Sequence, residues 1–367
     1  MRNGLRNKGL RRYDSPMKHR PTVKDVAKAV GVHASTVSRA LNPEKRGRLS
    51  DDLVARVLAA AETLGYRTNA LAASLRTRRS MAVGVIIPDI TNPVFPPILM
   101  GIEDALRAQG YISVVANTGN DSERARIAVE QLTARRLDGL ILATALRRDP
   151  LVDLCLARGM PAVFVNRRDE TRRIPSVVSD DEAGVQLAIE HLVALGHRRI
   201  AHIAGPSITS TGFARRRGFE FAMAEVDGAP RPPLVVEART YGRDSGHQAF
   251  LELLALNPKV TAIVTSNDLL ALGCCDAMRE ARLSCPADIS ITGYNDMPLL
   301  DIVTPPLTTV RIQHHEMGAE AARMLIDIIE NRERRAAMDI VLKPDLVVRG
   351  STAAPRATPA KLQLAEP

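Results

Sequence analysis

The fold of the amino-terminal region is decided by residues 22–42, which read TVKDVAKAVGVHASTVSRALN. Thr22, followed three residues later by Asp25, forms a capping box, which predicts that a helix begins at this point. The inner face of this short helix is predicted to consist of Val26, Ala27 and Val30. Gly31 then supplies a residue that adopts the left-handed conformation in which helices end.

A second short helix is predicted after a brief turn. Its inner face is formed by Val37, Ala40 and Leu41, and its outer face by Ala34, Ser35, Thr36, Ser38 and Arg39. Two short helices joined by a glycine-containing turn form a helix-turn-helix. Short polar groups and one guanidinium suit a helix in the major groove, where they reach base edges and phosphates. Such helix pairs also occur in ordinary cores, so this pattern alone leaves a purely structural role open.

A third helix is predicted to begin after Ser50, which suits the N-cap position, and to end at Gly65. The apolar residues that repeat at helical spacing along it are Leu53, Val54, Val57, Leu58, Ala61 and Leu64. Arg46 and Arg48 precede this helix, and they either meet phosphate or lie in a solvated loop. Three small helices of this kind make a compact unit.

Positive charge is concentrated at the amino-terminal end of the chain. The 367 residues carry a net charge of +9, but residues 1–80 hold 18 basic and 6 acidic side chains. The other 287 residues hold 32 basic and 35 acidic side chains. This asymmetry indicates a polyanion-binding head on an ordinary body. Residues 1–20 contain seven Lys or Arg without apolar periodicity, and we expect a disordered basic arm there.

Composition excludes several classes of protein. An apolar content of 45% excludes wholesale disorder, and no run of about 18–20 apolar residues predicts a membrane-spanning helix. No secretory signal is recognisable, so we expect a cytoplasmic protein without a membrane partner. The four cysteines lack paired metal-ligand spacing, and we expect them to be small core residues and no metal site to form. No GxGxxG after the first strand, GxxxxGK[ST] or GxSxG motif is present, so neither a cofactor nor catalytic residues are expected.

Apolar runs alternate with amphipathic segments from Met81 onward. The predicted strands are Val83–Ile87, Tyr111–Ala116, Gly139–Ala143, Ala162–Val165 and Ser176–Ser179, then Arg199–Gly205, Leu234–Ala238, Ala262–Ser266 and Asp288–Gly293. Buried strands that alternate with helices predict an α/β fold with parallel sheets. Two such series indicate two similar doubly wound subdomains, with ligands bound beyond the carboxyl ends of their strands.

The head of the chain resembles LacI/GalR-type bacterial transcription regulators. The strings DVA, GV and TVSRALN occur in order at the family spacing, followed by a Tyr-x-x-Asn-x-x-Ala-x-x-Leu tail. Family-like strings such as PDITNPVF, TSNDLLALG and DISITGYND continue the resemblance to about Thr352. It implies an all-α helix-turn-helix headpiece followed by two parallel doubly wound subdomains, built like a periplasmic sugar-binding protein.

The resemblance also implies domain boundaries. They are a headpiece at 21–67 with its motif at about 23–42, a hinge helix and linker at 68–80, a core at 81–350 and a disordered tail at 351–367. Within the core, the implied amino subdomain is 81–178 plus 311–341, and the implied carboxyl subdomain is 179–310 plus 342–350.

Twelve residues match the DNA-contacting positions of the family. They are Thr22, Val23, His33, Ala34, Ser35, Thr36, Ser38, Arg39 and Asn42 in the motif, and Asn69, Ala72 and Leu75 in the hinge. His33 stands where the family usually has Ser, which leaves open what caps the reading helix. Its imidazole either substitutes by touching a phosphate or is simply exposed. In this family Leu75 is an apolar wedge in the minor groove, whereas a flexible linker would let it pack on the body instead.

Five residues match the effector pocket of the family: Phe95, Asn166, Arg215, Tyr241 and Asn295. Asn295 stands where the family usually has Asp, and together with Arg215 this change favours an anionic ligand such as a sugar acid or a phosphorylated sugar. Two alternatives are that Asp296 takes the place of Asn295 in the pocket, or that Asn295 only caps a turn.

These observations predict a repressor that binds a near-palindromic double-stranded DNA operator as a homodimer. We expect its effector to be a small molecule, with a carbohydrate or sugar acid favoured, and its location to be the nucleoid. A transport-type solute-binding protein without a DNA role would share the body, but it would need a signal sequence and no basic head. An enzyme is the other alternative, because doubly wound sheets also host catalysts.

Overall fold

The computed structural model describes residues 21–66, 79–257, 259–330 and 339–356. The chain divides into two compact units, Met1–Ser80 and Met81–Pro367, which are described separately. The predicted basic arm, the hinge residues Asn69, Ala72 and Leu75, and most of the predicted tail lie outside the described residues.

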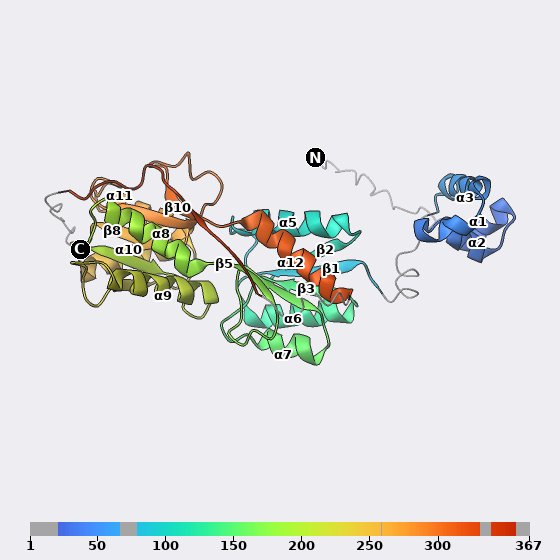
Figure 1. Ribbon diagram of the computed structural model, residues 1–367, viewed down its shortest axis with the longest axis horizontal. Coiled ribbons are helices and arrows are strands. Elements are labelled where there is room, and N and C mark those ends of the chain that lie inside the picture. The colour runs from blue at the N-terminus through green and yellow to red at the C-terminus, as the bar shows by residue number, and fades with distance from the viewer. Residues whose placement is uncertain (1–20, 67–78, 258, 331–338, 357–367) are drawn as a thin grey trace, which may run out of the picture. The chain divides into compact units, whose positions relative to one another are not determined.

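The headpiece is a bundle of short helices (Figure 1). Its elements are α1 (Val23–Val30), α2 (Ala34–Ala40), the 3-10 helix η1 (Pro43–Arg48) and α3 (Asp51–Thr63). The backbone N–H of Thr22 donates to the Asp25 carboxylate at 2.7 Å, and Gly31 has a φ of 74°. The predicted start and end of the first helix are therefore confirmed. Its predicted inner face is also confirmed, because Val26, Ala27 and Val30 are buried.

The third helix buries a narrower face than its apolar pattern predicts. Val57 and Ala61 are buried, but Leu58 and Leu64 are 39% and 37% exposed. Two short helices cover only one stripe of α3, and Leu58 lies about 100° around the helix from Val57. The helix is therefore where its apolar periodicity predicts it, but Leu58 and Leu64 lie outside its buried face. Arg46 has a structural role, since its Nε donates to the Ala40 carbonyl at 2.7 Å at the end of α2.

The amino subdomain is a six-stranded parallel sheet with helices on both faces. Its strands, in spatial order, are β11 (Ile340–Leu342), β5 (Ser176–Ser179), β4 (Ala162–Val165), β3 (Gly139–Leu142), β1 (Ala82–Ile87) and β2 (Ile112–Asn117). Its helices are α5 (Phe95–Ala108) and α12 (His314–Ile329) on one side, and α6 (Ser122–Ala134) and α7 (Pro150–Ala157) on the other (Figure 1). Val85 and Ile86 pack into different apolar clusters, because neighbouring strand residues point to opposite faces.

The carboxyl subdomain repeats this plan. Its strands, in spatial order, are β12 (Asp345–Val347), β10 (Thr308–Arg311), β9 (Ser290–Asn295), β8 (Ala262–Thr265), β6 (Ile200–Ala204) and β7 (Leu234–Glu237). Its helices are α8 (Asp181–Ala194), α9 (Ser210–Ala224), α10 (Arg243–Leu256) and α11 (Asp268–Glu280). The chain passes between the two subdomains after β5, after β10 and after β11. The expected fold class, two doubly wound α/β subdomains after a helical headpiece, is confirmed.

Two features of the sheets differ from expectation. The strand predicted at Tyr111–Ala116 is not buried, because β2 is an edge strand that pairs only with β1. Three of its apolar side chains, Ile112, Val114 and Val115, are 62%, 39% and 43% exposed. The short strands β10, β11 and β12 were not predicted, and β12 runs antiparallel to β10.

Helices α5 and α12 approach each other through glycine. A Cβ at Gly101 would lie 1.9 Å from the His315 carbonyl oxygen, and a Cβ at Gly318 would lie 2.0 Å from the Ile98 carbonyl oxygen. No side chain fits at either position without moving the backbone. This reciprocal contact fixes α12, which follows the second passage of the chain between subdomains, against the amino subdomain. No helix in the described part of the chain is long and apolar enough to cross a membrane.

Candidate functional site

The second helix of the headpiece begins on a histidine cap. His33 has extended backbone angles, and its ring Nδ1 accepts a hydrogen bond from the Ser35 backbone N–H at 3.3 Å. The same nitrogen lies 2.8 Å from the Ser35 hydroxyl oxygen. A ring nitrogen thus does what a Ser hydroxyl does at an N-cap, which answers the question that the sequence left open at this position. Accepting at Nδ1 leaves Nε2 to carry the proton of the neutral ring.

The side chains of α2 divide into a buried face and an accessible one. Val37 and Ala40 are buried, whereas Ser35 and Arg39 are exposed. The other candidates for DNA contact on this helix and beside it, Val23, Ala34, Thr36, Ser38 and Asn42, are half-buried, and Thr22 and His33 are exposed. The nine motif residues singled out by sequence are thus all accessible from outside the headpiece. This is the arrangement that a helix needs to enter a major groove.

The five predicted effector residues line one small cavity in the core. Phe95, Asn166, Arg215, Tyr241 and Asn295 surround it together with Asn92, Val94, Arg167, Thr211 and Asn267. Asn166 follows β4, Asn267 follows β8 and Asn295 ends β9, so three side chains come from the carboxyl ends of parallel strands. The cavity measures about 20 Å³, which is room for about one water molecule. No molecule much larger than water therefore fits this cavity in the observed arrangement.

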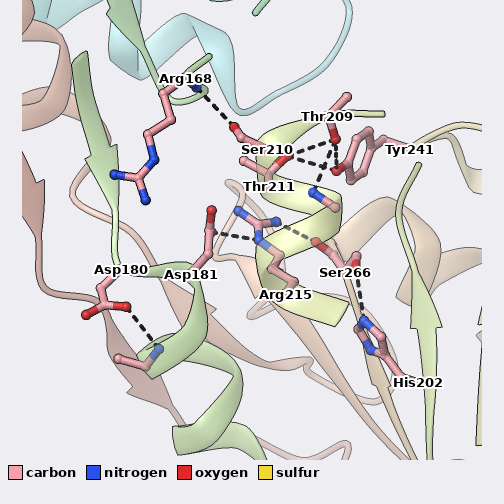
Figure 2. A network of polar contacts seen from close by, with 12 residues as sticks. Arg168, Asp180, Asp181, His202, Thr209, Ser210, Thr211, Arg215, Tyr241 and Ser266 are labelled. Carbon is pink, nitrogen blue, oxygen red and sulfur yellow. Dashed lines mark hydrogen bonds and ion pairs between the residues drawn. The ribbon is translucent and has the colours of Figure 1, made fainter. Parts of the chain in front are cut away.

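The charge of Arg215 is compensated from within the protein (Figure 2). Its Nε donates to Asp181 Oδ1 at 2.8 Å and its Nη1 donates to the Ser266 carbonyl at 2.5 Å. The guanidinium also lies 3.7 Å from the centre of the Tyr294 ring. Burial raises the pKa of Asp181, and the opposing influence of Arg215 is smaller. Burial alone would lower the pKa of Arg215, but Asp181 and the nearby tyrosines outweigh it, so this pKa is raised. Arg215 is therefore a weak source of net positive charge for a ligand.

Arg167 is a buried cation that the sequence reasoning missed. It is 8% exposed, its Nε has no hydrogen-bond partner, and it forms no ion pair with any carboxylate among the described residues. Burial lowers the pKa of its guanidinium. Its guanidinium carbon lies 5.5 Å from the centre of the Tyr241 ring. One feature of the sequence does point to Arg167: it directly follows Asn166, beyond the end of a buried strand.

Asn295 presents an unpaired acceptor to the cavity. Its Oδ1 is buried without a hydrogen-bond partner. Its backbone φ is 109° and that of Asn166 is 66°, a region in which asparagine is enriched among residues other than glycine. Asp296 does not take its place, because its carboxylate accepts hydrogen bonds from Arg311 and Arg349, each at 2.7 Å. A buried acceptor without a partner is unfavourable, so this atom is suited to receive a donor from a ligand.

Tyr241 and Asn267 are held in place by the carboxyl subdomain. The Tyr241 hydroxyl lies 2.9 Å from the hydroxyl oxygens of both Thr209 and Thr211 (Figure 2). The Asn267 side-chain N–H donates to the Tyr241 carbonyl at 3.0 Å, and its Oδ1 caps α11 at Leu270. Asn267, another residue that sequence reasoning missed, thus positions the aromatic wall of the cavity.

A second cavity of about 290 Å³ adjoins the first and shares Arg167 and Tyr241 with it. Its polar lining includes Thr118, Asn120, Asp121, Thr144, Asp149 and Arg239. This volume lies at the lower end of the range found for small-molecule sites. A ligand that reached both cavities would contact the unpaired donor of Arg167.

Comparisons with known proteins agree with this architecture. Residues 22–69 match the lacI family of bacterial regulatory proteins, and residues 189–352 match the periplasmic binding protein-like domain. An HTH-type transcriptional regulator from the region 5′ of aml in Streptomyces limosus is 36% identical over 340 residues, which are 91% of this chain and 95% of that protein. The ribose operon repressor of Halalkalibacterium halodurans is 33% identical over 311 residues, which are 85% of this chain and 91% of that protein.

Solved structures show the same likeness. The Lac repressor dimer bound to operator and the anti-inducer ONPF superposes with a TM-score of 0.82 at 28% identity, covering 92% of this chain and 100% of that one. A LacI family regulator from Enterococcus faecium with bound ribose has a TM-score of 0.65 at 32% identity, covering 75% of this chain and 100% of that one.

Proposed function

The chain belongs to the LacI family of bacterial transcription regulators, and from this premise we propose which of its residues read DNA and what kind of effector it senses. It is a DNA-binding regulator with a sugar-binding type of core, and not an enzyme or a transport-type binding protein. As in its relatives, repression rests on a dimer that presents two headpieces to a two-fold symmetric operator.

In the proposed complex α2 lies in the major groove. Ala34 and Ser35, in the first turn of α2, contact base edges. Arg39 and the neighbouring hydroxyl groups bind the phosphate backbone of the DNA. The proposed headpiece is residues 21–67, joined through a hinge at 68–80 to a core at 81–350. This proposal is supported by the accessible polar face of α2 and by the net charge of +12 on residues 1–80. Chromosomal operators make the nucleoid, in the cytoplasm, the proposed place of action.

The proposed dimer contact of the core includes the β2 edge. Ile112 and Val114 on β2 and Met100 on α5 are exposed apolar side chains, and Met100 is 62% exposed. Exposed apolar groups gathered at one edge of a monomer mark an interaction surface. Replacing Ile112 and Val114 together by charged residues should yield monomers on size-exclusion chromatography, and a persistent dimer would move the contact elsewhere.

The proposed effector is a sugar that carries a negative group, such as a sugar acid or a sugar phosphate. The observation that carries this proposal is the unpaired buried charge of Arg167, together with neutral Asn166 and Asn295 in the same cavity. Arg167 supplies the positive charge that Arg215, already compensated by Asp181, does not. The unpaired Asn295 Oδ1 accepts from a sugar hydroxyl, and Tyr241 stacks on the ring.

Calorimetric titration with matched pairs tests this proposal: an aldose against the corresponding aldonic acid, and a hexose against its phosphate. We expect the anionic member of one pair to bind at least tenfold more tightly. We also expect Arg167→Gln to abolish that preference while leaving binding of the neutral sugar nearly unchanged. Binding of neutral sugars alone, with no effect of Arg167→Gln, would overturn the anionic part of the proposal.

Selection of bound fragments from genomic DNA tests the regulator role itself. The recovered fragments should share a near-palindromic site, and affinity for it should fall steeply with salt concentration. Arg39→Gln should weaken binding to this site. Retention of no preferred fragment over scrambled competitor, with or without metabolites, would refute specific DNA recognition, and unchanged binding by Arg39→Gln would refute the assignment of α2 as the reading helix.

A further inference from the structure

A further cavity lies between the two subdomains and takes no part in the proposed effector site. It measures about 730 Å³, which is within the range found for small-molecule sites. Its amino-subdomain side includes Arg147, Arg168 and Arg172, and its carboxyl-subdomain side includes Asp180 and Phe213. This Arg168 cavity, as we call it, shares no lining residue with the two cavities described above.

Contacts between the subdomains separate the Arg168 cavity from the effector cavities. Leu146 and Arg147 are neighbours in sequence, but Leu146 lines the cavity of about 290 Å³ and Arg147 lines the Arg168 cavity. Arg167 and Arg168 divide in the same way, and the Arg168 N–H donates to the Ser210 hydroxyl at 3.0 Å. A ligand in the Arg168 cavity therefore contacts the same backbone segments that close the effector cavities.

One ion pair joins the two sites through this partition. Asp181 lines the Arg168 cavity, Arg215 lines the small effector cavity, and Arg215 Nε donates to Asp181 Oδ1 at 2.8 Å. A charge that is placed near Asp181 in one cavity thus changes the electrostatic potential at Arg215 in the other.

Two arginines on the amino-subdomain side share one carboxylate. Arg168 Nη1 and Arg172 Nε lie 3.5 and 3.6 Å from the same oxygen of Asp339. Within the part of the chain that the structure describes, neither side chain pairs with another carboxylate. Asp169 is buried, and its Oδ1 accepts from the Thr171 N–H at 2.9 Å instead. One positive charge on this side therefore has no counterion of its own.

A carboxylate without a cationic partner lies on the carboxyl-subdomain side. Asp180 is exposed, and its Oδ1 accepts a backbone N–H at the start of α8 at 3.1 Å. Its neighbours Asp181 and Glu182 pair with Arg215 and Arg217, whereas Asp180 forms no ion pair with any described residue. The two sides of the cavity thus carry uncompensated charges of opposite sign.

The rest of the wall is apolar. Val341 on β11 is 51% exposed, and Pro175 and Val178 line the same cavity. Phe213 adds an aromatic ring, with the guanidinium carbon of Arg147 3.6 Å from its centre. An apolar group of a ligand would be removed from water here.

We propose that the Arg168 cavity binds a free α-amino acid with an apolar side chain. Its carboxylate accepts hydrogen bonds from Arg168 and Arg172, whose planar guanidinium groups match a carboxylate, and its ammonium donates to Asp180. Figure 2 shows the Arg168 side chain extending toward the side on which Asp180 and Asp181 lie. A zwitterion satisfies both sides of the cavity, whereas a ligand with one charge satisfies only one.

The proposed ligand opposes an effector that favours a wider cleft. By bridging Arg168 of one subdomain to Asp180 of the other, it stabilises the observed arrangement. Each of the two ligands therefore lowers the affinity for the other, by the same factor.

Calorimetric titration of the full-length protein with single amino acids tests this proposal, with L-valine, L-leucine, L-methionine and L-phenylalanine as probes. We expect at least one of them to bind at one molecule per chain. Its N-acetyl derivative, which lacks the ammonium, and its amide, which lacks the carboxylate, should each bind about tenfold more weakly, because each loses a charge-assisted contact. Absence of binding by all four, or equal binding of both derivatives, would overturn the proposal. No sugar is needed for this readout, so it is independent of the proposed effector.

Four variants locate the bound amino acid. Arg168→Gln and Asp180→Asn should each weaken binding about tenfold, and Asn still caps α8. Arg148→Gln is the matched control, since Arg148 is 90% exposed and outside the cavity, and it should bind as the wild type does. Arg167→Gln should also bind normally. Unchanged binding by Arg168→Gln and Asp180→Asn, or loss of binding in Arg167→Gln alone, would place the amino acid elsewhere and overturn the proposal. The wild-type comparison with the two derivatives remains decisive even if a variant does not fold.

Discussion

Replacing Asp181 by Asn tests whether the positive charge of Arg215 is compensated by Asp181 or is available to bind a ligand. The two side chains are 9% and 3% exposed, and Arg215 Nε donates to Asp181 Oδ1 at 2.8 Å. Asn keeps the shape and one acceptor but removes the negative charge. Arg215 then has the Ser266 carbonyl, the face of Tyr294 and the neutral Asn oxygen as partners, but no counterion.

The expected cost is large because both groups are buried. Removing one partner of a buried ion pair usually destabilises a protein by about 3–5 kcal/mol, since an uncompensated charge is left behind. The carbonyl and ring contacts of Arg215 remain, so we expect Asp181→Asn to fall near the lower end, about 3 kcal/mol. Arg215→Met should cost a similar amount, because it leaves Asp181 without its counterion. The double variant should cost clearly less than the sum, with a coupling energy of about 2 kcal/mol.

Guanidinium unfolding of the full-length protein, followed by far-UV circular dichroism, measures these differences, and hydrogen exchange of α8 and α9 locates them. Asp181→Asn should also bind anionic sugars more tightly than the wild type does, because the cleft gains a net positive charge. Additive single substitutions, or an unchanged stability of Asp181→Asn, would refute the conclusion that this pair compensates itself.

Four further outcomes are expected. His33→Ala should weaken operator binding measurably in fluorescence anisotropy, by up to the equivalent of about 1 kcal/mol of lost capping, and His33→Ser should restore it; equal weakening by both would deny the ring its capping role. Burial lowers the pKa of His202 from 6.5 to about 4, so only the unfolded chain gains this proton as pH falls from 6.5 to 4 and stability falls with it. When the pH is lowered from 7 to 5, the free energy of unfolding should therefore decrease by about 2 kcal/mol less in His202→Gln than in the wild type, and equal decreases would contradict this. Gly101→Ala should lower stability by about 1–3 kcal/mol or more in thermal unfolding, because its Cβ meets the α12 backbone; an unchanged transition would argue against the close approach. Leu75→Ala should weaken specific DNA binding more than non-specific binding in filter assays, and an equal loss in both would count against a wedge.

Local sequence patterns were sufficient to predict most of the helices and strands. Caps and periodicity located the headpiece helices, and nine buried runs located nine of the twelve strands of the core. Two of the three missed strands, such as Ile340–Leu342, have only three residues, too few for a pattern to be visible, and Thr308–Arg311 has no apolar run because it reads TTVR. The exposure of β2 was also out of reach, because it depends on which strand ends the sheet.

The sequence predicted which residues line the candidate site, but not which of their side chains form ion pairs and hydrogen bonds with one another. The five effector residues matched to the family do line one cavity. The compensation of Arg215 was not predictable, because Asp181 is 34 residues away and on another helix. Likewise, the role of Arg167 depends on the absence of an ion pair between it and any carboxylate of the described residues, which no sequence pattern reports. Charge balance in a cleft is a property of the assembled fold.

The contacts across the observed cleft determine how much more tightly an effector must bind a wider cleft than the observed one in order to open it. Across the cleft, Leu146 pairs with Thr209 in a β-bridge that includes the hydrogen bond from the Arg147 N–H to the Ile208 carbonyl at 3.0 Å. The Arg168 N–H also donates to the Ser210 hydroxyl at 3.0 Å (Figure 2). At about 1 kcal/mol net for each hydrogen bond, these two bonds are worth about 2 kcal/mol. An effector shifts the equilibrium only by the ratio of its affinities for the two arrangements. A ligand that favours a wider cleft by about thirtyfold therefore offsets these two hydrogen bonds and makes the two arrangements about equally populated. The Tyr241 hydroxyl, which is hydrogen-bonded to Thr209, places a residue of the cavity wall beside these contacts.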